Sequence, residues 1–432
     1  MAVRTAYTLG LHREETLVIF SADEQTSRKR LWRSLFTMDR FLAAHLGRPV
    51  AIAEEECSGE SLNPQTNTFA KTTRLAPGQV CSAGLEASVR SCHVIGLILR
   101  KVYLQRKVST RLAQEIAEKC REWPENLSPA LHWRQASPNN RRQAIAILHS
   151  NLAYCHSIIL LTRPFFLYLM SSEFQRIQLG SDQDRRRSHT RMSKREKFSN
   201  ACIIASTHTV ALVQNASDGR YLPKMNSFVS YSLFAAALII FANEWARPSS
   251  NILTQQCMAN SIAILSYCGE MDPQAKRSAH VLTEFRNTIR QQGQQAAFQV
   301  PLPPVVQSSL SAPGGGHATF IPTLESGFPA TLPLPGATSA SNAVPTPATT
   351  APFASSTLAP PQYPWEDSFS GLLDLNNTVL PSFSDQDSAL GTSGDESIDF
   401  DTLWGQWPGS TPAGPAVPGS DDASAASLFE RV

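Results

Sequence analysis

The sequence predicts an all-α, multi-helix domain followed by a long disordered C-terminal tail. Apolar residues recur at helical spacing through residues 1–292, and nothing there alternates between apolar and polar for long enough to force a strand. From about residue 293 the chain is rich in Pro, Ala, Ser, Thr and Gly. That part has too little apolar content to offset the entropy of ordering it.

The charged residues divide the chain at nearly the same place. Residues 291–432 contain thirteen acidic residues and one Arg, a net charge of −12, and the total of +2 leaves +14 for residues 1–290. We therefore expect three parts: a basic helical domain over residues 1–292, a disordered linker over 293–361, and a disordered segment over 362–432 that combines acidic and aromatic residues.

Cysteine spacing and hydropathy indicate the compartment. The eight cysteines include no pair at Cys-x-x-Cys spacing, so we expect free, mostly buried thiols and a reducing intracellular environment. The most apolar stretch, residues 228–242, is shorter than the roughly 20 residues that a membrane span needs. We expect a buried helix there and no membrane contact.

Residues 21–52 contain the best specified helix. Ser21 and Glu24 fit a capping box, in which the two side chains satisfy backbone groups at a helix start. Gly47, which tolerates a left-handed conformation, and Pro49, which cannot continue a helix, predict its end.

The same helix carries a broad apolar stripe. We expect this face to be buried, and its members are Leu31, Trp32, Leu35, Phe36, Met38, Leu42 and Leu46. Asp39 projects within the stripe, where a carboxylate needs a partner, and Arg48 is the nearest candidate. We interpret this pair as fixing the turn onto the core. A ligand-binding role is the alternative.

The remaining elements follow in order. Residues 58–84, rich in Asn, Thr, Pro and Gly, predict a long loop, and Pro164 should break or kink its helix. The other predicted helices cover residues 1–12, 85–108, 110–123, 140–170, 198–215, 226–246, 252–271 and 273–292.

A basic run occupies the predicted loop at residues 181–197. Such runs can act as a nuclear-localisation signal or contact phosphate, and a solvated loop between helices is the alternative. The basic residues are Arg185, Arg186, Arg187, Arg191, Lys194, Arg195 and Lys197.

The C-terminal part contains what we call the acidic–aromatic segment, residues 362–432. Acidic residues keep bulky apolar side chains exposed in a disordered chain, ready to enter a partner's groove as a short amphipathic helix. An ordinary low-complexity tail is the alternative. The expected anchor residues are Trp365, Phe369, Leu372, Leu373, Phe400, Leu403 and Trp404.

Enzymatic motifs do not occur. The sequence has no Gly-x-Ser-x-Gly, no His-Glu-x-x-His, no phosphate-binding Gly loop after a strand and no dinucleotide fingerprint. His149 and His156 lack a third metal ligand and should be packing residues, and Glu54, Glu55 and Glu56 look like a solvated acidic run. We therefore assign no catalytic residue, no metal ligand and no cofactor, and expect the chain not to be an enzyme.

Several motifs together resemble the middle homology region of fungal binuclear zinc-cluster transcription factors, the fungal-specific or xylanolytic-type regulatory domain. They are Leu-Gly-Leu-His at 9–12, Leu-Gly-Arg-Pro at 46–49 and Arg-Pro-Phe at 163–165, and the resemblance covers about residues 1–292. The residues that match the family's markers are Leu31, Trp32, Asp39, Arg40, Gly47, Arg48, Pro49, Arg163, Pro164 and Phe165.

The resemblance implies the regulatory and activation portion of a nuclear factor that controls RNA polymerase II transcription. The acidic–aromatic segment would then recruit the transcription machinery or a coactivator. Family members carry an N-terminal six-cysteine cluster that holds zinc and reads DNA. This sequence lacks it, so zinc and DNA binding are expected only in a longer parent, and the mid-helix start at Met1 suggests an N-terminally truncated domain. The alternative is a helical domain that senses a small-molecule effector and co-regulates without its own DNA binding.

Overall fold

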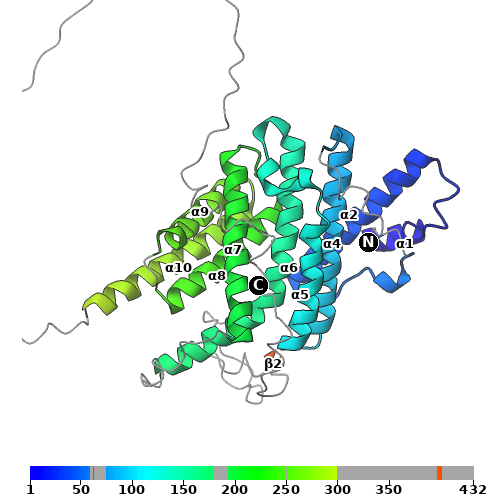
Figure 1. The fold of residues 1–432 in the computed structure, drawn as a ribbon. Helices are drawn as coiled ribbons and strands as arrows, with labels where there is room; N and C mark the ends of the chain where they lie inside the picture. Colours follow the sequence, from blue (N-terminus) through cyan, green and yellow to red (C-terminus); the bar gives the residue numbers. More distant parts are fainter. Residues whose placement is uncertain (59–61, 63–73, 179–192, 249–250, 299–396, 401–432) are drawn as a thin grey trace, which may run out of the picture. The chain divides into compact units, whose positions relative to one another are not determined.

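The computed structural model describes residues 1–58, 62, 74–178, 193–248, 251–298 and 397–400. The fold is all-α, as predicted (Figure 1). Its main helices are α1 (Ala2–Thr8), α2 (Ala22–Leu46), α4 (Pro77–Ile98), α5 (Thr110–Glu125), α6 (Arg141–Gln178), α7 (Lys194–Asp218), α8 (Ser227–Ala246), α9 (Ile252–Cys268) and α10 (Pro273–Phe298). Shorter elements are η1 (Glu54–Glu56), the π-helix η2 (Leu99–Tyr103), η3 (Pro129–Leu131), η4 (Trp133–Gln135), η5 (Pro138–Asn140), β1 (Lys107–Ser109) and β2 (Ser397–Asp399).

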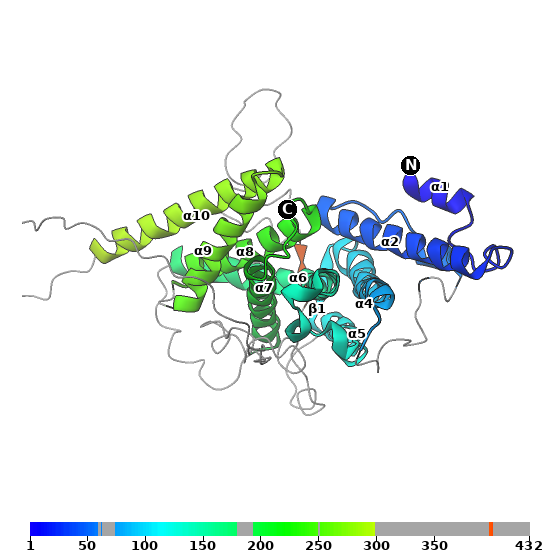
Figure 2. The ribbon, with the colours of Figure 1, turned by 90° about the horizontal axis from the view of Figure 1, so that it is seen from above.

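Helix α6 lies at the centre of the helical unit (Figures 1 and 2). Helices α4 and α5 pack on one side of it, and α7 and α8 pack on the other. Helices α9 and α10 extend the layer beyond α8, while α2 packs against α4. The central helix is therefore buried along most of its length, which explains why its sequence is apolar nearly all round.

Two groups of buried side chains stabilise this arrangement. The larger group runs from α4 to α10, and stacked rings join its helices: Trp123 lies on Tyr154 with 4.4 Å between ring centroids, and Phe165 lies on Phe198 with 4.8 Å. The smaller group joins α1, α2 and α4, with Trp32 at its centre. Burial of large apolar side chains contributes about 1.5–3 kcal/mol each, so these groups dominate the stability of the fold.

The ends of α2 agree with the prediction. Ser21 Oγ accepts a hydrogen bond from the Glu24 N–H, and Gly47 has the left-handed φ of 61°. The Glu24 carboxylate does not complete a capping box, because it accepts from Arg28 one turn later at 3.0 Å. The helix start is thus capped from one side only, with Asp23 and Glu24 opposing the positive end of its dipole.

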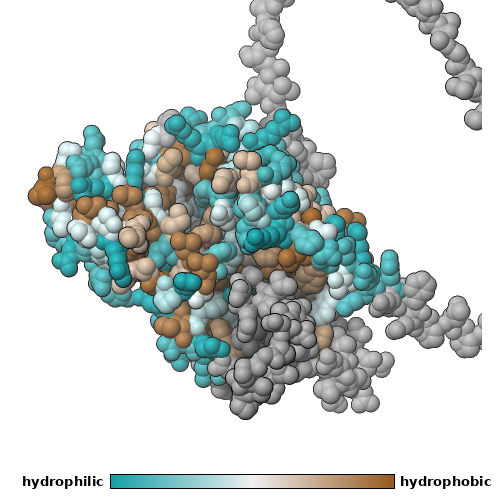
Figure 3. All heavy atoms as spheres, turned by 180° about the vertical axis from the view of Figure 1, so that it is seen from behind, coloured by the Kyte–Doolittle hydropathy of each residue, from teal (hydrophilic) through white to brown (hydrophobic). Residues whose placement is uncertain are grey.

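The buried face of α2 differs from the prediction. Four members of the predicted stripe are exposed by 43–57%: Leu31, Met38, Leu42 and Leu46. Apolar side chains lie at the surface on the side of the N-terminal helices, on the left of Figure 3. The buried line runs through Trp32, Phe36, Arg40 and Ala43. Trp32 and Phe36 belong to the predicted stripe, but Arg40 does not. Arg40 is buried on this line with two carboxylate partners, whereas Met38 and Leu42 lie at the surface.

Helix α4 begins earlier than predicted. Residues 77–84 were assigned to a loop, but they are helical, and the helix begins with a proline, which is favourable at that position because no N–H is needed there. Gly84 was counted as a loop signal, yet it lies where α4 contacts α6. A Cβ built on Gly84 would lie 2.9 Å from the Ala146 Cβ. The glycine therefore sets the distance between the two helices.

This contact gives a testable prediction. Replacing Gly84 by alanine should lower the free energy of unfolding by about 2 kcal/mol, because the added methyl overpacks the α4–α6 contact. Helix propensity alone would give the opposite sign, since alanine is favoured over glycine by about 1 kcal/mol within a helix. Urea unfolding followed by circular dichroism measures the difference. Gly78→Ala is the matched control, since nothing lies within 4 Å of its Cβ, and equal effects of both changes would contradict the prediction.

Pro164 was expected to break or kink its helix, and it does not break it. Helix α6 continues through Pro164 to Gln178. A proline has no N–H to donate to the carbonyl four residues earlier, here that of Leu160. The Tyr103 hydroxyl donates to this Leu160 oxygen at 2.9 Å. A side chain from η2 thus satisfies the backbone group that the proline leaves open.

Two helical stretches, Pro138–Phe174 and Ser227–Ala246, are long and apolar enough to cross a membrane. Their most apolar windows are 83% and 72% buried inside the fold. Such burial is the property of core helices, which agrees with the interpretation of residues 228–242 from the sequence.

The prediction that residues 1–292 contain no strand is wrong in one place. The expected helix over residues 85–108 ends in η2, and β1 follows it. β1 pairs antiparallel with β2, which belongs to the acidic–aromatic segment. A three-residue strand is too short to show a period of two, so the sequence pattern could not reveal it.

Candidate functional site

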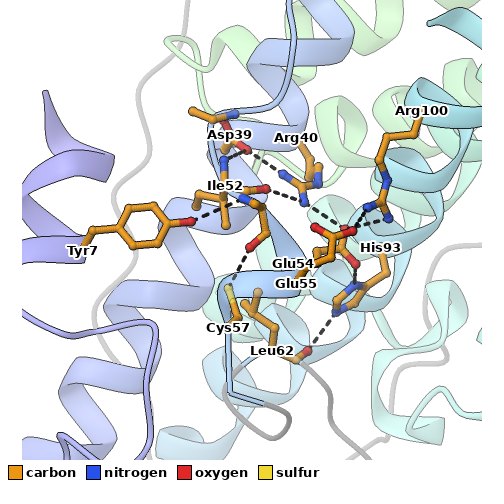
Figure 4. Close-up of polar contacts among 12 residues, drawn as sticks. Tyr7, Asp39, Arg40, Ile52, Glu54, Glu55, Cys57, Leu62, His93 and Arg100 are labelled. Carbon is orange, nitrogen blue, oxygen red and sulfur yellow. Dashed lines mark hydrogen bonds and ion pairs between the residues drawn. The ribbon is translucent and has the colours of Figure 1, made fainter.

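An interconnected set of charged side chains lies between α2, η1, α4 and η2 (Figure 4). We call it the Arg40 cluster, and its members are Asp39, Arg40, Glu54, Glu55, His93 and Arg100. It contains two of the residues that matched the family's motifs, so we treat it as the candidate site and build it up one side chain at a time.

Arg40 is the centre of the cluster and is only 1% exposed. Its guanidinium donates to Asp39 Oδ2 at 2.6 Å, to Glu54 Oε1 at 2.8 Å and to the Ile52 carbonyl at 3.0 Å. Its cationic carbon lies 4.3 Å from the centroid of the Phe36 ring. Charge-assisted hydrogen bonds to two carboxylates offset the cost of burying the guanidinium.

Asp39 connects the end of α2 to the segment that follows the turn. Its carboxylate accepts from the Ala51 N–H at 2.9 Å and from the Ile52 N–H at 3.1 Å. The predicted partner was Arg48, and this is wrong: Arg48 is exposed, and the partner is the neighbouring Arg40. In the turn after α2, Arg48 lies at the surface. The chain after the turn lies beside Asp39, so the Ala51 and Ile52 N–H groups donate to its carboxylate.

Glu54 was interpreted as part of a solvated acidic run, and the structure contradicts this. Burial raises the pKa of Glu54, but the hydrogen bonds and charges of His93 and Arg40 outweigh it and lower the pKa to about 2. Glu54 Oε2 lies 2.9 Å from His93 Nδ1. Glu54 is therefore ionised at neutral pH and fully engaged, which excludes it as a general acid.

His93 and Arg100 complete the network from α4 and η2. The second ring nitrogen of His93 lies 3.0 Å from the Leu62 carbonyl, so each of its two ring nitrogens faces an oxygen acceptor. Arg100 pairs with Glu55 and approaches Glu54 at 3.9 Å. The three carboxylates of the cluster are thus each paired with a guanidinium or with the His93 ring.

The segment between the turn and η1 is also fixed from α1. The Ala53 N–H donates to the Tyr7 hydroxyl at 3.3 Å, and the Cys57 thiol donates to the Ala53 carbonyl at 3.3 Å. Burial raises the pKa of Tyr7 to about 12, so its hydroxyl stays neutral. The Arg40 cluster, together with Tyr7, thus joins α1, α2, η1, α4 and η2 as a structural clamp.

Sequence reasoning missed His93, Arg100 and Gly96 as members of this arrangement. A Cβ on Gly96 would lie 2.7 Å from Arg40 Nε and 2.9 Å from Glu54 Oε1. Gly96 therefore provides the space for the buried ion pair. A glycine inside an otherwise apolar helical pattern was the available signal, because such a position usually has a packing reason.

The other family-marker residues lie in separate places. Trp32 is fully buried, with its ring 5.6 Å from that of Tyr7, and Leu31 is exposed. Gly47 and Pro49 form the turn after α2. The Arg163, Pro164 and Phe165 triplet lies on α6, away from the Arg40 cluster, where the guanidinium carbon of Arg163 is 5.5 Å from the centroid of the Tyr103 ring.

The structure describes three residues of the basic run. Lys194, Arg195 and Lys197 lie in the first turn of α7, where Ser193 and Glu196 form a capping box. They are thus not in a loop, and the Arg195 guanidinium lies 4.6 Å from the Tyr168 ring centroid. Four basic residues lie outside the described residues: Arg185, Arg186, Arg187 and Arg191.

Of the expected anchor residues, the structure describes only Phe400. Its side chain is 8% exposed and belongs to the main core, so the expectation that it is exposed is wrong. The remaining anchors lie outside the described residues: Trp365, Phe369, Leu372, Leu373, Leu403 and Trp404.

Metal and small-molecule sites receive no support from the described part of the chain. No group of three or more His, Cys, Asp or Glu side chains is arranged there to hold a metal ion. The eight cysteines are free thiols, six of them buried, as expected. A pocket between α6, α7 and α8 has a volume of about 10 Å³, enough for one water molecule and too small for a metabolite.

The fold is a helical domain, and the charged side chains of the Arg40 cluster pair with one another across its elements. Residues 1–119, which include the Arg40 cluster, match the family described as the fungal specific transcription factor domain. This part of the chain is similar to that family, in agreement with the motifs at residues 9–12 and 46–49.

The relatives that it resembles are regulators of transcription. The chain is 22% identical over 304 residues to an uncharacterized transcriptional regulatory protein of Schizosaccharomyces pombe, covering 66% of this chain and 34% of that protein. It is 27% identical over 175 residues to the transcriptional activator protein acu-15 of Neurospora crassa, covering 38% and 19%. It is 26% identical over 245 residues to cutinase transcription factor 1 alpha of Fusarium vanettenii, covering 55% and 25%. The chain spans about a third or less of each of these relatives. No solved structure matches it.

Proposed function

We propose that this chain is the regulatory and activation portion of a fungal transcription regulator that acts in the nucleus on RNA polymerase II transcription. The match of residues 1–119 to the fungal specific transcription factor domain carries the proposal. The Arg40 cluster supports a regulatory role over a catalytic one, because its ionisable groups are paired with one another.

The proposed partners follow from the two unusual stretches of sequence. The acidic–aromatic segment would bind the transcription machinery or a coactivator, with its bulky side chains entering an apolar groove. The basic run would serve nuclear import or contact phosphate. DNA and zinc would be bound by a six-cysteine module of a longer parent. Within the described residues, no group of three or more His, Cys, Asp or Glu side chains is arranged to hold a metal ion.

A sensor domain for a small-molecule effector is less well supported. The relatives are named for regulation of transcription, and the pocket between α6, α7 and α8 has a volume of only about 10 Å³. A metabolite site of ordinary size encloses about 300–1,000 Å³.

A reporter assay tests the proposed function. The full chain is fused to an unrelated DNA-binding domain, and reporter output is expected to exceed that of the DNA-binding domain alone. Replacing Trp365, Phe369 and Trp404 by alanine should reduce the output several-fold, since aromatic anchors carry most of the affinity of such contacts.

The matched control replaces three aromatic residues of the predicted linker, Phe320, Phe328 and Phe353, by alanine. This variant loses equal aromatic content outside the acidic–aromatic segment and should keep its output. An equal loss in both triple variants, or no output above the DNA-binding domain alone, would contradict the proposed function.

A further inference from the structure

Four residues of the acidic–aromatic segment, Ser397–Phe400, lie against the helical domain (Figures 1 and 2). β2 is antiparallel to β1 and its register places Asp399 opposite Lys107, Ile398 opposite Val108 and Ser397 opposite Ser109. The Phe400 N–H donates to the Arg106 carbonyl at 2.9 Å, which extends the ladder beyond the strand.

The apolar side chains of this short segment enter the core. Ile398 is 2% exposed and Phe400 is 8% exposed, and both belong to the main group of buried residues. The Phe400 ring meets the Tyr103 ring edge to face, with 5.7 Å between centroids and 69° between planes. Burial of two such side chains favours the docked position of the segment.

Contacts within the helical domain fix the position of the Tyr103 ring, against which this segment packs. Pro164 leaves the Leu160 carbonyl without a helical donor, and the Tyr103 hydroxyl supplies it at 2.9 Å, which fixes the ring that Phe400 contacts. Arg163 lies over the same Tyr103 ring. After η2, Arg106 adopts a left-handed φ of 49°, which reverses the chain and starts β1 with an edge free to pair.

Charge is complementary along the contact. Arg106 directly precedes β1, Lys107 is the first residue of β1, and Asp399 is the last residue of β2. Lys107 and Asp399 are directly opposite in the register, an arrangement that stabilises an antiparallel pair.

We propose that the edge of β1, together with the Tyr103 ring, is a binding site for a short extended peptide of apolar–acidic–aromatic pattern, and that residues 397–400 of the same chain are its resident ligand. Strand addition supplies main-chain hydrogen bonds, and the buried Ile398 and Phe400 supply specificity.

One consequence rests on the proposed function. Phe400 is one of the expected anchors for the transcription machinery, and it cannot occupy this site and a partner's groove at once. Docking of residues 397–400 therefore withholds part of the acidic–aromatic segment from its partner, and a competing peptide of the same pattern would release it.

Hydrogen exchange of the full chain tests the site. In the unmodified chain, the amides of residues 397–400 should be protected. Ile398→Asp places a charge in the core and should speed their exchange about tenfold or more. Ser397→Asp is the matched control, because it adds the same charge on the opposite face of the strand and should leave protection unchanged.

A second pair of variants avoids buried positions altogether. Lys107→Glu and Asp399→Lys each set like charges opposite one another and should speed exchange several-fold, while the double variant should restore protection. Both positions are exposed, so the fold of the helical domain is not at risk.

Peptide binding provides an independent measurement. A labelled peptide of residues 394–403 should bind the Ile398→Asp chain at least about tenfold more tightly than the unmodified chain, whose site is already occupied. Equal exchange at residues 397–400 in the two chains, or equal peptide binding, overturns the proposal. Protection that falls on dilution would place a second copy's segment in the site and would equally overturn it.

Reporter output tests separately whether docking of residues 397–400 withholds the acidic–aromatic segment from its partner. In the full-chain fusion, Ile398→Asp should raise the output several-fold over the unmodified chain, and Ser397→Asp should not. Unchanged output together with the expected exchange pattern would refute the regulatory consequence and leave the peptide site established. Loss of the exchange pattern would refute the site whatever the output.

Discussion

Replacing Arg40 by leucine is expected to lower the free energy of unfolding by about 4 kcal/mol, because it leaves the carboxylates of Asp39 and Glu54 without their buried cationic partner. The loss should appear as a lower urea midpoint with an unchanged denaturant slope, the signature of altered stability without altered compactness. Leucine fits the apolar surroundings of α2, so the loss of stability arises from the carboxylates of Asp39 and Glu54, which lose their cationic partner.

Arg48→Leu is the matched control for this change. It makes the same substitution at the exposed arginine just after α2, and its effect should stay within about 0.5 kcal/mol. If the two variants unfolded at the same urea concentration, the Arg40 cluster would not stabilise the fold as proposed. A double variant that also replaces Asp39 by asparagine should lose less than the sum of the two changes, because the residues interact directly.

His156→Leu is expected to reduce the sensitivity of the fold to acid. Burial, followed by the charges of Arg163 and His45, lowers the pKa of His156 from 6.5 to about 3. As the pH falls below 6.5, the unfolded chain binds a proton that the folded chain does not, so stability is lost from pH 6.5 downward until about pH 3. At pH 4 the loss from this residue amounts to about 3 kcal/mol.

The measurement is the free energy of unfolding at several pH values between 7 and 4. In the leucine variant the slope should fall by about one proton, or roughly 1.4 kcal/mol per pH unit. His280→Gln is the control, since His280 is exposed and its replacement should leave the profile unchanged. A leucine variant with the same pH profile as the unmodified chain would contradict the assignment. His208, whose pKa burial lowers to about 4, should supply part of the remaining slope.

Local signals predicted the ends of α2 well. Ser21 and Gly47 act through hydrogen bonds and backbone conformation within a few residues, so their effect is visible in the sequence. The buried face of the same helix was not predictable in this way. Arg40 is buried because Glu54 and Gly96 meet it from elements far along the chain, and a hydrophobic pattern treats arginine as a surface residue.

The contact between β1 and β2 shows the same limit more strongly. Each strand has three residues, too few for a periodic signal, and the two lie in parts of the chain with opposite predicted character. The acidic surroundings of Phe400 indicated an exposed anchor. Its burial follows from the Tyr103 ring and the edge of β1, which only the assembled helices bring together.

The buried thiols give this fold a set of internal probes. Burial raises the pKa of five of them to about 12, which leaves almost no reactive thiolate at neutral pH: Cys92, Cys120, Cys155, Cys202 and Cys257. They lie in α4, α5, α6, α7 and α9. Alkylation of each thiol therefore reports the local unfolding of its own helix. The order in which the helices unfold could then be followed by mass spectrometry without engineering a cysteine or a probe into the chain.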